Sequence, residues 1–299
     1  MNNKATKINW ANFHTHSLYC DGVGELEVYV KKAIEKKMFA IGFSSHAPVP
    51  FPSGGHMESS KLDNYINEIE NLKRKYSNKI NIYSGLEVEY IPNIIGPNSF
   101  RKKNLDIIIG SVHYVNQYDD GENYLFDITV EEFKKGFELI FNNNIKKLVK
   151  GYYGNVISMV ENDPPDVIGH LDLIKKFNNN NRYFNENDDW YKYILLDVIK
   201  VISKSNCIVE INTRGYYKGI TKEFYPGQWI VEKCLEHSIP IAISADAHNA
   251  EDVNNSFEEA ASFLLDIGYK NVQIFNEGKW QKVGLSKNGF EIYNEIENG

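Results

Sequence analysis

Six short apolar segments of this 299-residue chain each end in a histidine or a carboxylate. The first spans residues 8–13 and leads into His14-Thr15-His16. The other five lead into His46, Glu87, His113, His170 and the pair Asp246 and His248. Parallel strands that close into a barrel bring their carboxyl ends together on one face, so ligands far apart in the sequence can converge on one pocket. The pattern predicts an α/β barrel with a metal site at those ends.

Amphipathic segments separate the apolar runs, which is the alternation of strands and helices typical of a parallel sheet. The helices expected from this pattern span 25–37, 59–76, 129–149, 187–203, 223–237 and 251–267. In the second of them, apolar residues at 62, 65, 66, 69 and 72 follow the helical period of 3.6. We expect seven barrel strands, with 270–275 as a candidate eighth, and one barrel domain over 1–299. The loops 47–58 and 116–127 are expected to cover the site.

The composition favours a soluble cytoplasmic protein. No apolar run reaches the roughly 18 residues that span a bilayer. Residues 1–10 lack the apolar core and cleavage site of a secretory signal, and three cysteines without regular spacing do not indicate a disulfide framework. The net charge of -7 disfavours nucleic acid as a partner. We therefore expect neither a membrane nor a nucleic-acid partner.

The histidines are the strongest chemical signal. Residues two apart in a strand point to the same face, so His14 and His16 can bind one cation. By itself a His-x-His pair is as well explained by chance on a surface strand. However, seven of the eight histidines lie at the ends of the expected strands or directly beyond them, whereas structural histidines would be scattered. His237, late on an expected helix, is the exception and is interpreted as structural.

Carboxylates complete the expected site because they can bridge two cations and offset their charge. Glu87 and Glu89 share a face of one strand, so only one of them need be a ligand, and we favour Glu87. Asp246 and His248 repeat the spacing of the first histidine pair. Asp172, two residues after His170, could be a ligand, a partner that orients a ligand, or a substrate contact.

Several longer motifs accompany these residues. They are His46-Ala47-Pro48, GLEVEYIP at 85–92, Gly110-Ser111-Val112-His113, GHLDLI at 169–174 and EINTRG at 210–215. The chain resembles the polymerase and histidinol phosphatase (PHP) superfamily over nearly its whole length, and within it the PHP-type histidinol phosphatases. The resemblance implies a distorted seven-stranded, TIM-like (β/α)7 barrel that holds three metal ions. Several members have a further histidine after the first pair, where this chain has Cys20-Asp21-Gly22, so Asp21 would be the ligand there.

The resemblance also implies which residues hold each ion. The first ion would be bound by His14, His16, Glu87 and Asp246, the second by Glu87, His113 and His170, and the third by His46, His248 and Asp21. A hydroxide shared by two ions would attack phosphorus, because coordinated water loses its proton near neutral pH. Asp246 and His248 would take part in catalysis. Two to three divalent ions are expected, and zinc, iron and manganese all suit these ligands.

Arg214, which ends the apolar run 207–213, is the natural phosphate ligand outside the metal site. A guanidinium binds phosphate oxygens in two-pronged fashion and stays charged. The alternative is an ordinary solvated loop arginine. No nucleotide-binding loop or serine-hydrolase elbow is present, so neither chemistry finds support.

The resulting expectation is a histidinol phosphatase that hydrolyses L-histidinol phosphate to L-histidinol and phosphate. The alternatives are a PHP phosphoesterase for nucleotides, sugar phosphates or phosphotyrosine, a proofreading exonuclease module of a polymerase, and a non-catalytic relic. The sequence leaves the metal identity and the oligomeric state open. Asp172 and Asp119 are candidates for binding the substrate ammonium.

Overall fold

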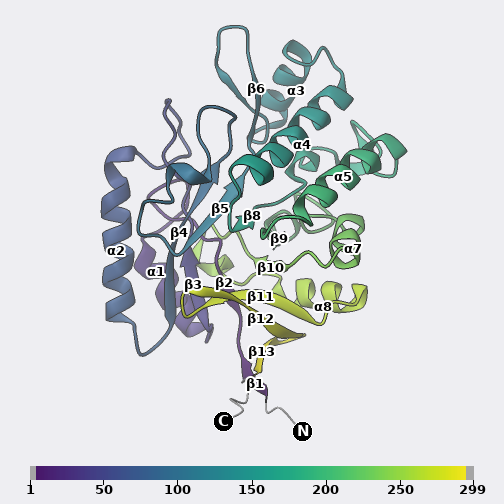
Figure 1. Ribbon diagram of the computed structural model, residues 1–299. Helices are drawn as coiled ribbons and strands as arrows, with labels where there is room; N and C mark the ends of the chain where they lie inside the picture. Colours follow the sequence, from purple (N-terminus) through teal and green to yellow (C-terminus); the bar gives the residue numbers. More distant parts are fainter. Residues whose placement is uncertain (1–4, 294–299) are drawn as a thin grey trace.

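Seven parallel strands form the centre of the computed structural model, which describes residues 5–293 (Figure 1). They are β2 (Ala11–Asn12), β3 (Ala40–Phe43), β4 (Asn81–Glu89), β5 (Ile107–Ser111), β8 (Val167–Ile168), β9 (Ile208–Asn212) and β10 (Ile241–Ser244). The sheet order is β10-β9-β8-β5-β4-β3-β2, and every adjacent pair is parallel. Strands buried on both faces need continuous apolar runs, and Ile107, Ile108 and Ile109 of β5 are all buried.

Hydrogen bonds join the two edge strands of this sheet just beyond their carboxyl ends. The amide of Ala247 donates to the carbonyl oxygen of His14 over 3.1 Å, and the amide of His16 donates to the carbonyl oxygen of Ala247 over 2.9 Å. The side-chain oxygen of Asn12 accepts a further bond of 3.1 Å from the amide of Ala245. The sheet is therefore nearly closed, which confirms the predicted α/β barrel.

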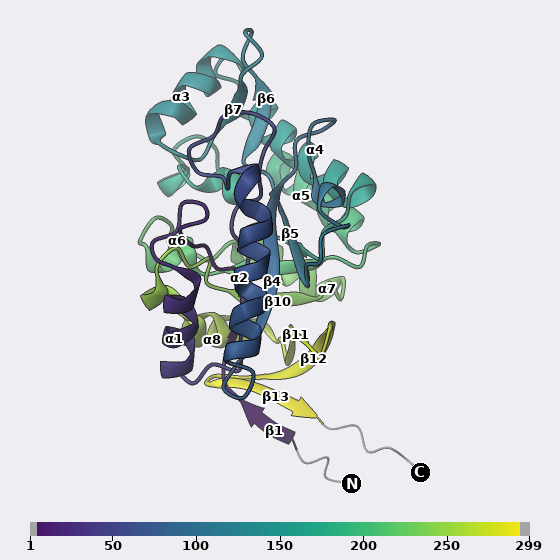
Figure 2. The ribbon, with the colours of Figure 1, turned by 90° about the vertical axis from the view of Figure 1, so that its left-hand side faces the viewer.

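Helices pack around the barrel (Figures 1 and 2). They are α1 (Leu26–Glu35), α2 (Leu62–Lys75), α3 (Val130–Leu139), α4 (Ile145–Asn162), α5 (Asp189–Ile202), the short α6 (Arg214–Tyr217), α7 (Gln228–Glu236) and α8 (Phe257–Ile267). The side chains Leu62, Tyr65, Ile69 and Leu72 form the buried face of α2, as its period of 3.6 predicts. No helix within the described part of the chain is long and apolar enough to cross a membrane.

A second, antiparallel sheet covers the opposite end of the barrel from the site. Its order is β1 (Ala5–Ile8), β13 (Gly289–Tyr293), β12 (Lys279–Ser286) and β11 (Asn271–Asn276), and both ribbon views place it far from the β6–β7 hairpin described below. The ring of Trp280 packs edge-on against Phe13 and Phe275, at 5.5 Å from each. The prediction of 270–275 as a candidate eighth barrel strand is therefore wrong, because this segment forms β11, which pairs with β12 and not with a barrel strand.

Two further segments differ from the expectation. The segment 129–149 forms two helices, because Asn142 and Asn143 have φ angles of 49° and 56°, which a helix does not permit. The side chain of Asn144 then accepts a hydrogen bond from the amide of Lys147 and caps α4. The expected loop 116–127 is mostly the hairpin of β6 (Tyr114–Gln117) and β7 (Asn123–Leu125), which stands beyond the carboxyl end of the barrel (Figure 2).

Candidate metal centre

The side chains predicted as metal ligands all lie at the carboxyl end of the barrel. The ligand candidates that follow strands or lie near their carboxyl ends are His14, His16, His46, Glu87, His113, His170, Asp246 and His248, and Asp21 lies in the turn after the first pair. His170 and Asp246 have φ angles of 22° and 50°. Such backbone strain in residues other than glycine is concentrated at functional sites. The barrel thus brings together the whole predicted ligand set.

Glu87 lies at the centre of this cluster. Its Oε2 lies 3.4 Å from Nε2 of His14, 3.4 Å from Nε2 of His16 and 3.0 Å from Nδ1 of His46. Its Oε1 lies 2.9 Å from Nε2 of His170. One carboxylate therefore faces two sets of imidazoles with its two oxygens, which is the arrangement needed to bridge two cations.

Several buried polar atoms of the cluster make no hydrogen bond with the described residues. They are Nε2 of His14, Nε2 of His16, Nδ1 of His46 and Oδ1 of Asp246. Buried polar atoms without a partner are destabilising, so clusters of them are rare unless something binds there. His14, His16 and Asp246 each offer an atom within 4.8 Å of the others, close enough to hold a metal ion. The residues present therefore fit a metal ion.

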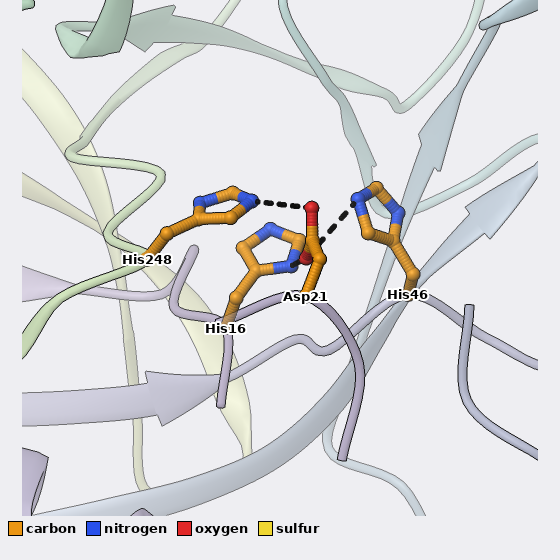
Figure 3. A group of neighbouring side chains, drawn as sticks. All are labelled: His16, Asp21, His46 and His248. Carbon is orange, nitrogen blue, oxygen red and sulfur yellow. Dashed lines mark hydrogen bonds and ion pairs between the residues drawn. The ribbon is translucent and has the colours of Figure 1, made fainter. Parts of the chain in front are cut away.

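Asp21 forms a second group with three histidines (Figure 3). Its Oδ2 lies 3.2 Å from Nε2 of His248, and its Oδ1 lies 3.5 Å from Nδ1 of His16 and 3.9 Å from Nε2 of His46. In Figure 3 His46 lies on one side of the carboxylate, and His16 and His248 lie on the other. These four side chains could also hold a metal ion.

Two carboxylates lie behind the cluster: Glu210, to which no role was assigned from the sequence, and Glu89, which was the alternative to Glu87 as a ligand. Oε1 of Glu210 lies 2.5 Å from Nδ1 of His14, and Oε1 of Glu89 lies 2.6 Å from Nδ1 of His113. A carboxylate on one ring nitrogen fixes the tautomer and leaves the other nitrogen free to bind a metal. The sequence did contain a sign of the role of Glu210, because this residue lies inside a buried apolar strand. A charged side chain in such a strand needs a partner.

The charge state of the cluster follows from burial and mutual contacts. Burial opposes ionisation of Glu87, but His46 and His14 outweigh it and hold the pKa of this carboxyl well below its usual range. Burial likewise opposes ionisation of Asp246, and His14 and His16 outweigh it, so its pKa is also low. Burial lowers the pKa of His46 to about 3 despite Glu87. Burial also opposes protonation of His14 and His113, but Glu210 and Glu89 outweigh it and raise the pKa of both rings above the usual range. Metal ions bind the neutral imidazole, so a bound ion would have to displace the protons of these two rings.

Arg214 lies beside the cluster, whereas Asp172 does not face it. Nη1 of Arg214 donates to the carbonyl oxygen of Asp246 over 3.0 Å and lies 2.7 Å from Nδ1 of His248. Oδ2 of Asp172 instead pairs with Nζ of Lys175 at 2.8 Å and accepts a 2.9 Å hydrogen bond from the amide of Gly227. Asp172 thus lines a neighbouring cleft.

His56 does not lie at a strand end, so that part of the histidine pattern is wrong. It belongs to the loop 47–58, where its Nδ1 bonds Oγ of Ser53 at 2.6 Å and its Nε2 lies 3.1 Å from Oε1 of Glu89. This loop and the end of the hairpin line a cavity of about 420 Å³ above the cluster, called the cluster cavity below. Both segments therefore cover the site as predicted.

His237, interpreted above as structural, is exposed at the end of α7.

The fold and the site together define a class, an α/β-barrel protein with a cluster able to bind metal ions. The PHP domain family matches residues 12–214, so the chain belongs to this family. It is 29% identical to a Schizosaccharomyces pombe protein named "Probable histidinol-phosphatase", over 89% of each chain. It is 27% identical to the histidinol-phosphatase of Bacillus subtilis, over 82% of this chain and 96% of that one.

The fold is also similar to a solved structure, that of histidinol phosphate phosphatase from Lactococcus lactis in complex with zinc, L-histidinol and phosphate. The TM-score is 0.68 at 22% identity, over 91% of this chain and 98% of that one. This likeness supports the barrel fold described above.

Proposed function

We propose that the protein is a metal-dependent histidinol phosphatase, which hydrolyses L-histidinol phosphate to L-histidinol and phosphate. The observation that carries the proposal is the cluster around Glu87, in a chain that matches histidinol phosphatases over most of its length. A phosphate monoester is an anion that needs its charge neutralised during hydrolysis, and a cluster of this chemistry suits that task. The substrate is accordingly a small molecule.

The residues present fit two to three divalent ions of zinc, iron or manganese type. His14, His16, Glu87 and Asp246 would hold the first, Glu87, His113 and His170 the second, and His46, His248 and Asp21 the third. When bound there, such ions neutralise phosphate oxygens and lower the pKa of water. The unpartnered nitrogens of His14 and His16 and the central place of Glu87 support this assignment.

The remaining roles fall to side chains around the cluster. Arg214, on the cavity wall, would bind the phosphoryl group through two nitrogens. Asp246 and His248 lie side by side on the cavity wall, with Oδ1 of Asp246 3.3 Å from Nδ1 of His248, and we assign both to catalysis as well as to metal binding. Glu210 and Glu89 would hold His14 and His113 in the tautomer that binds metal.

A panel of phosphate esters tests the proposal. The metal-loaded protein should hydrolyse histidinol phosphate with a higher kcat/KM than nucleotides, sugar phosphates, phosphotyrosine or a simple aryl phosphate. A clear preference for one of those other esters, or degradation of single-stranded DNA, would assign the site to another phosphoesterase. Absence of any hydrolysis after metal loading would remove the enzymatic proposal altogether.

We also propose that the chain is one domain. The hydrophobic core of the described residues supports this, because it continues from the barrel into the antiparallel sheet. Trp10, for example, packs edge-on against Phe257 of α8 at 5.7 Å and against Phe290 of β13 at 5.1 Å. The test is a single cooperative unfolding transition.

A further inference from the structure

One carboxylate on the wall of the cluster cavity differs from the rest. The others pair with histidines: they are Asp21, Glu87, Glu89 and Asp246. Asp127 instead pairs with Lys176, whose Nζ lies 3.0 Å from Oδ2. Within residues 5–293, Oδ1 of Asp127 takes part in no hydrogen bond, and the side chain, 15% exposed, borders the cavity. This oxygen is therefore available to a ligand.

The position of Asp127 is fixed by the segments that carry two of the histidines. It follows β7, and the amide of the preceding Phe126 donates to the carbonyl oxygen of His113 over 3.2 Å. Lys176 follows the short 3-10 helix that begins just after His170, and its Nζ donates to both the backbone oxygen and Oδ2 of Asp127. Asp127 is thus held next to the cluster with one oxygen anchored.

Asp127 is ionised, so its free oxygen can offer a negative charge to a ligand. Burial opposes its ionisation, but Lys176 and His113 outweigh burial and keep its pKa below the usual range. The two carboxylates that the sequence offered for the substrate ammonium lie elsewhere. Asp119 is exposed between the strands of the β6–β7 hairpin, and Asp172 pairs with Lys175 in the neighbouring cleft.

We propose that Asp127 binds the ammonium group of histidinol phosphate and so selects this substrate among phosphate esters. This inference rests on the proposed function. Histidinol phosphate has an anionic phosphate at one end, an ammonium on the neighbouring carbon and an imidazole beyond it. The cavity offers Arg214 and the cluster for the phosphate, Asp127 for the ammonium, and apolar wall from Leu173, Ile220 and Tyr225 for the rest.

The test compares histidinol phosphate with its analogue without the amino group, 3-(imidazol-4-yl)propyl phosphate. The wild-type kcat/KM should be about 10- to 100-fold higher on histidinol phosphate, as expected for a hydrogen bond to a charged group. Asp127→Asn should lower the histidinol phosphate value to that of the analogue and leave the analogue and a simple aryl phosphate unchanged. Asp127→Glu, which keeps the charge, should retain part of the preference.

Asp119→Asn is the matched control, because it removes a carboxylate from the same hairpin outside the cavity, and it should leave both substrates unchanged. Equal wild-type rates on the two substrates overturn the inference and leave the proposed function intact, whether or not Asp127→Asn folds. Equal losses of Asp127→Asn on both, at normal metal content, also overturn it. If the wild type hydrolyses other esters but not histidinol phosphate, the proposed function itself fails.

Discussion

At the scale of single residues, the cluster depends on carboxylates that orient its imidazoles. Glu210 is fully buried and holds Nδ1 of His14, so that Nε2 faces Glu87. Glu210→Gln keeps the shape but removes the charge, and we expect it to weaken metal binding by about 10- to 100-fold. Metal titration of the variant checks this, with excess metal restoring part of the activity. An unchanged affinity would show that Glu210 only fills space.

Substitution of Arg214 tests the proposal that this residue binds the phosphoryl group. Arg214→Ala should lower kcat/KM by about two to three orders of magnitude on histidinol phosphate and on an aryl phosphate alike, since both share the phosphoryl group. Metal content should stay intact. Arg214→Lys should recover only part of the loss, because lysine restores the charge without the two-pronged geometry. Near-normal rates of the alanine variant on both esters would refute the role.

The three acidic ligand candidates should differ in their importance. Glu87 faces imidazoles with both oxygens, and Asp246 contacts His14 and His16. Asp21, whose side chain is 39% exposed, belongs to a group with three histidines that can still coordinate without it. Alanine at Glu87 or Asp246 should therefore abolish turnover, whereas Asp21→Ala should retain some. If all three variants lost activity equally and mildly in steady-state assays, Glu87 would not be the bridging carboxylate.

At the scale of elements, the β6–β7 hairpin is docked on α3 by Tyr124. Its hydroxyl donates to the carbonyl oxygen of Phe133 over 2.9 Å, and its ring lies where a side chain at Gly136 would begin. Gly136→Ala should therefore destabilise the protein by about 1–3 kcal/mol through overpacking. Because the hairpin leads into Asp127, the KM for histidinol phosphate should rise as well.

Gly154 in α4 provides the matched control. It is exposed, and a side chain there would meet no atom of residues 5–293 within 4 Å. Gly154→Ala should stabilise the protein by about 0.5–1 kcal/mol, because alanine loses less backbone entropy in a helix. Thermal unfolding at matched metal content measures both variants. A shift of Tm in the same direction for both would contradict the proposed packing at Gly136.

At the scale of the whole molecule, ions bound at the cluster should stabilise the fold. A ligand that binds only the native state raises the free energy of unfolding by mass action. Within residues 5–293, buried atoms of His14, His16 and Asp246 make no hydrogen bond and could coordinate such ions. We expect two to three ions per purified chain. A chelator should abolish activity and lower Tm, and added metal should restore both. Metal analysis that finds no ions, with activity and Tm unaffected by chelator, would exclude the cluster as a metal site.

The barrel and most of the candidate site follow from patterns in the amino-acid sequence. Continuous apolar runs, such as that of β5, specify buried parallel strands, and the period of 3.6 specifies the buried face of α2. A histidine or carboxylate at the end of such a strand must lie at one face of the barrel, whichever order the strands take. This is why the ligand candidates were found without knowledge of the strand order.

The pairing of side chains and strands, in contrast, depends on how the whole chain folds. β11 has the pattern of a barrel strand but pairs with β12, and pairing depends on the neighbour available and not on local pattern. Glu210 meets His14 across 196 positions of sequence, a contact that exists only once the barrel closes. Likewise, Asp127 lies on the cavity wall and Asp119 does not, because the hairpin docks on α3. Local sequence patterns specify where strands form and end. Contacts between distant segments depend on the closure of the barrel and on the register of its strands.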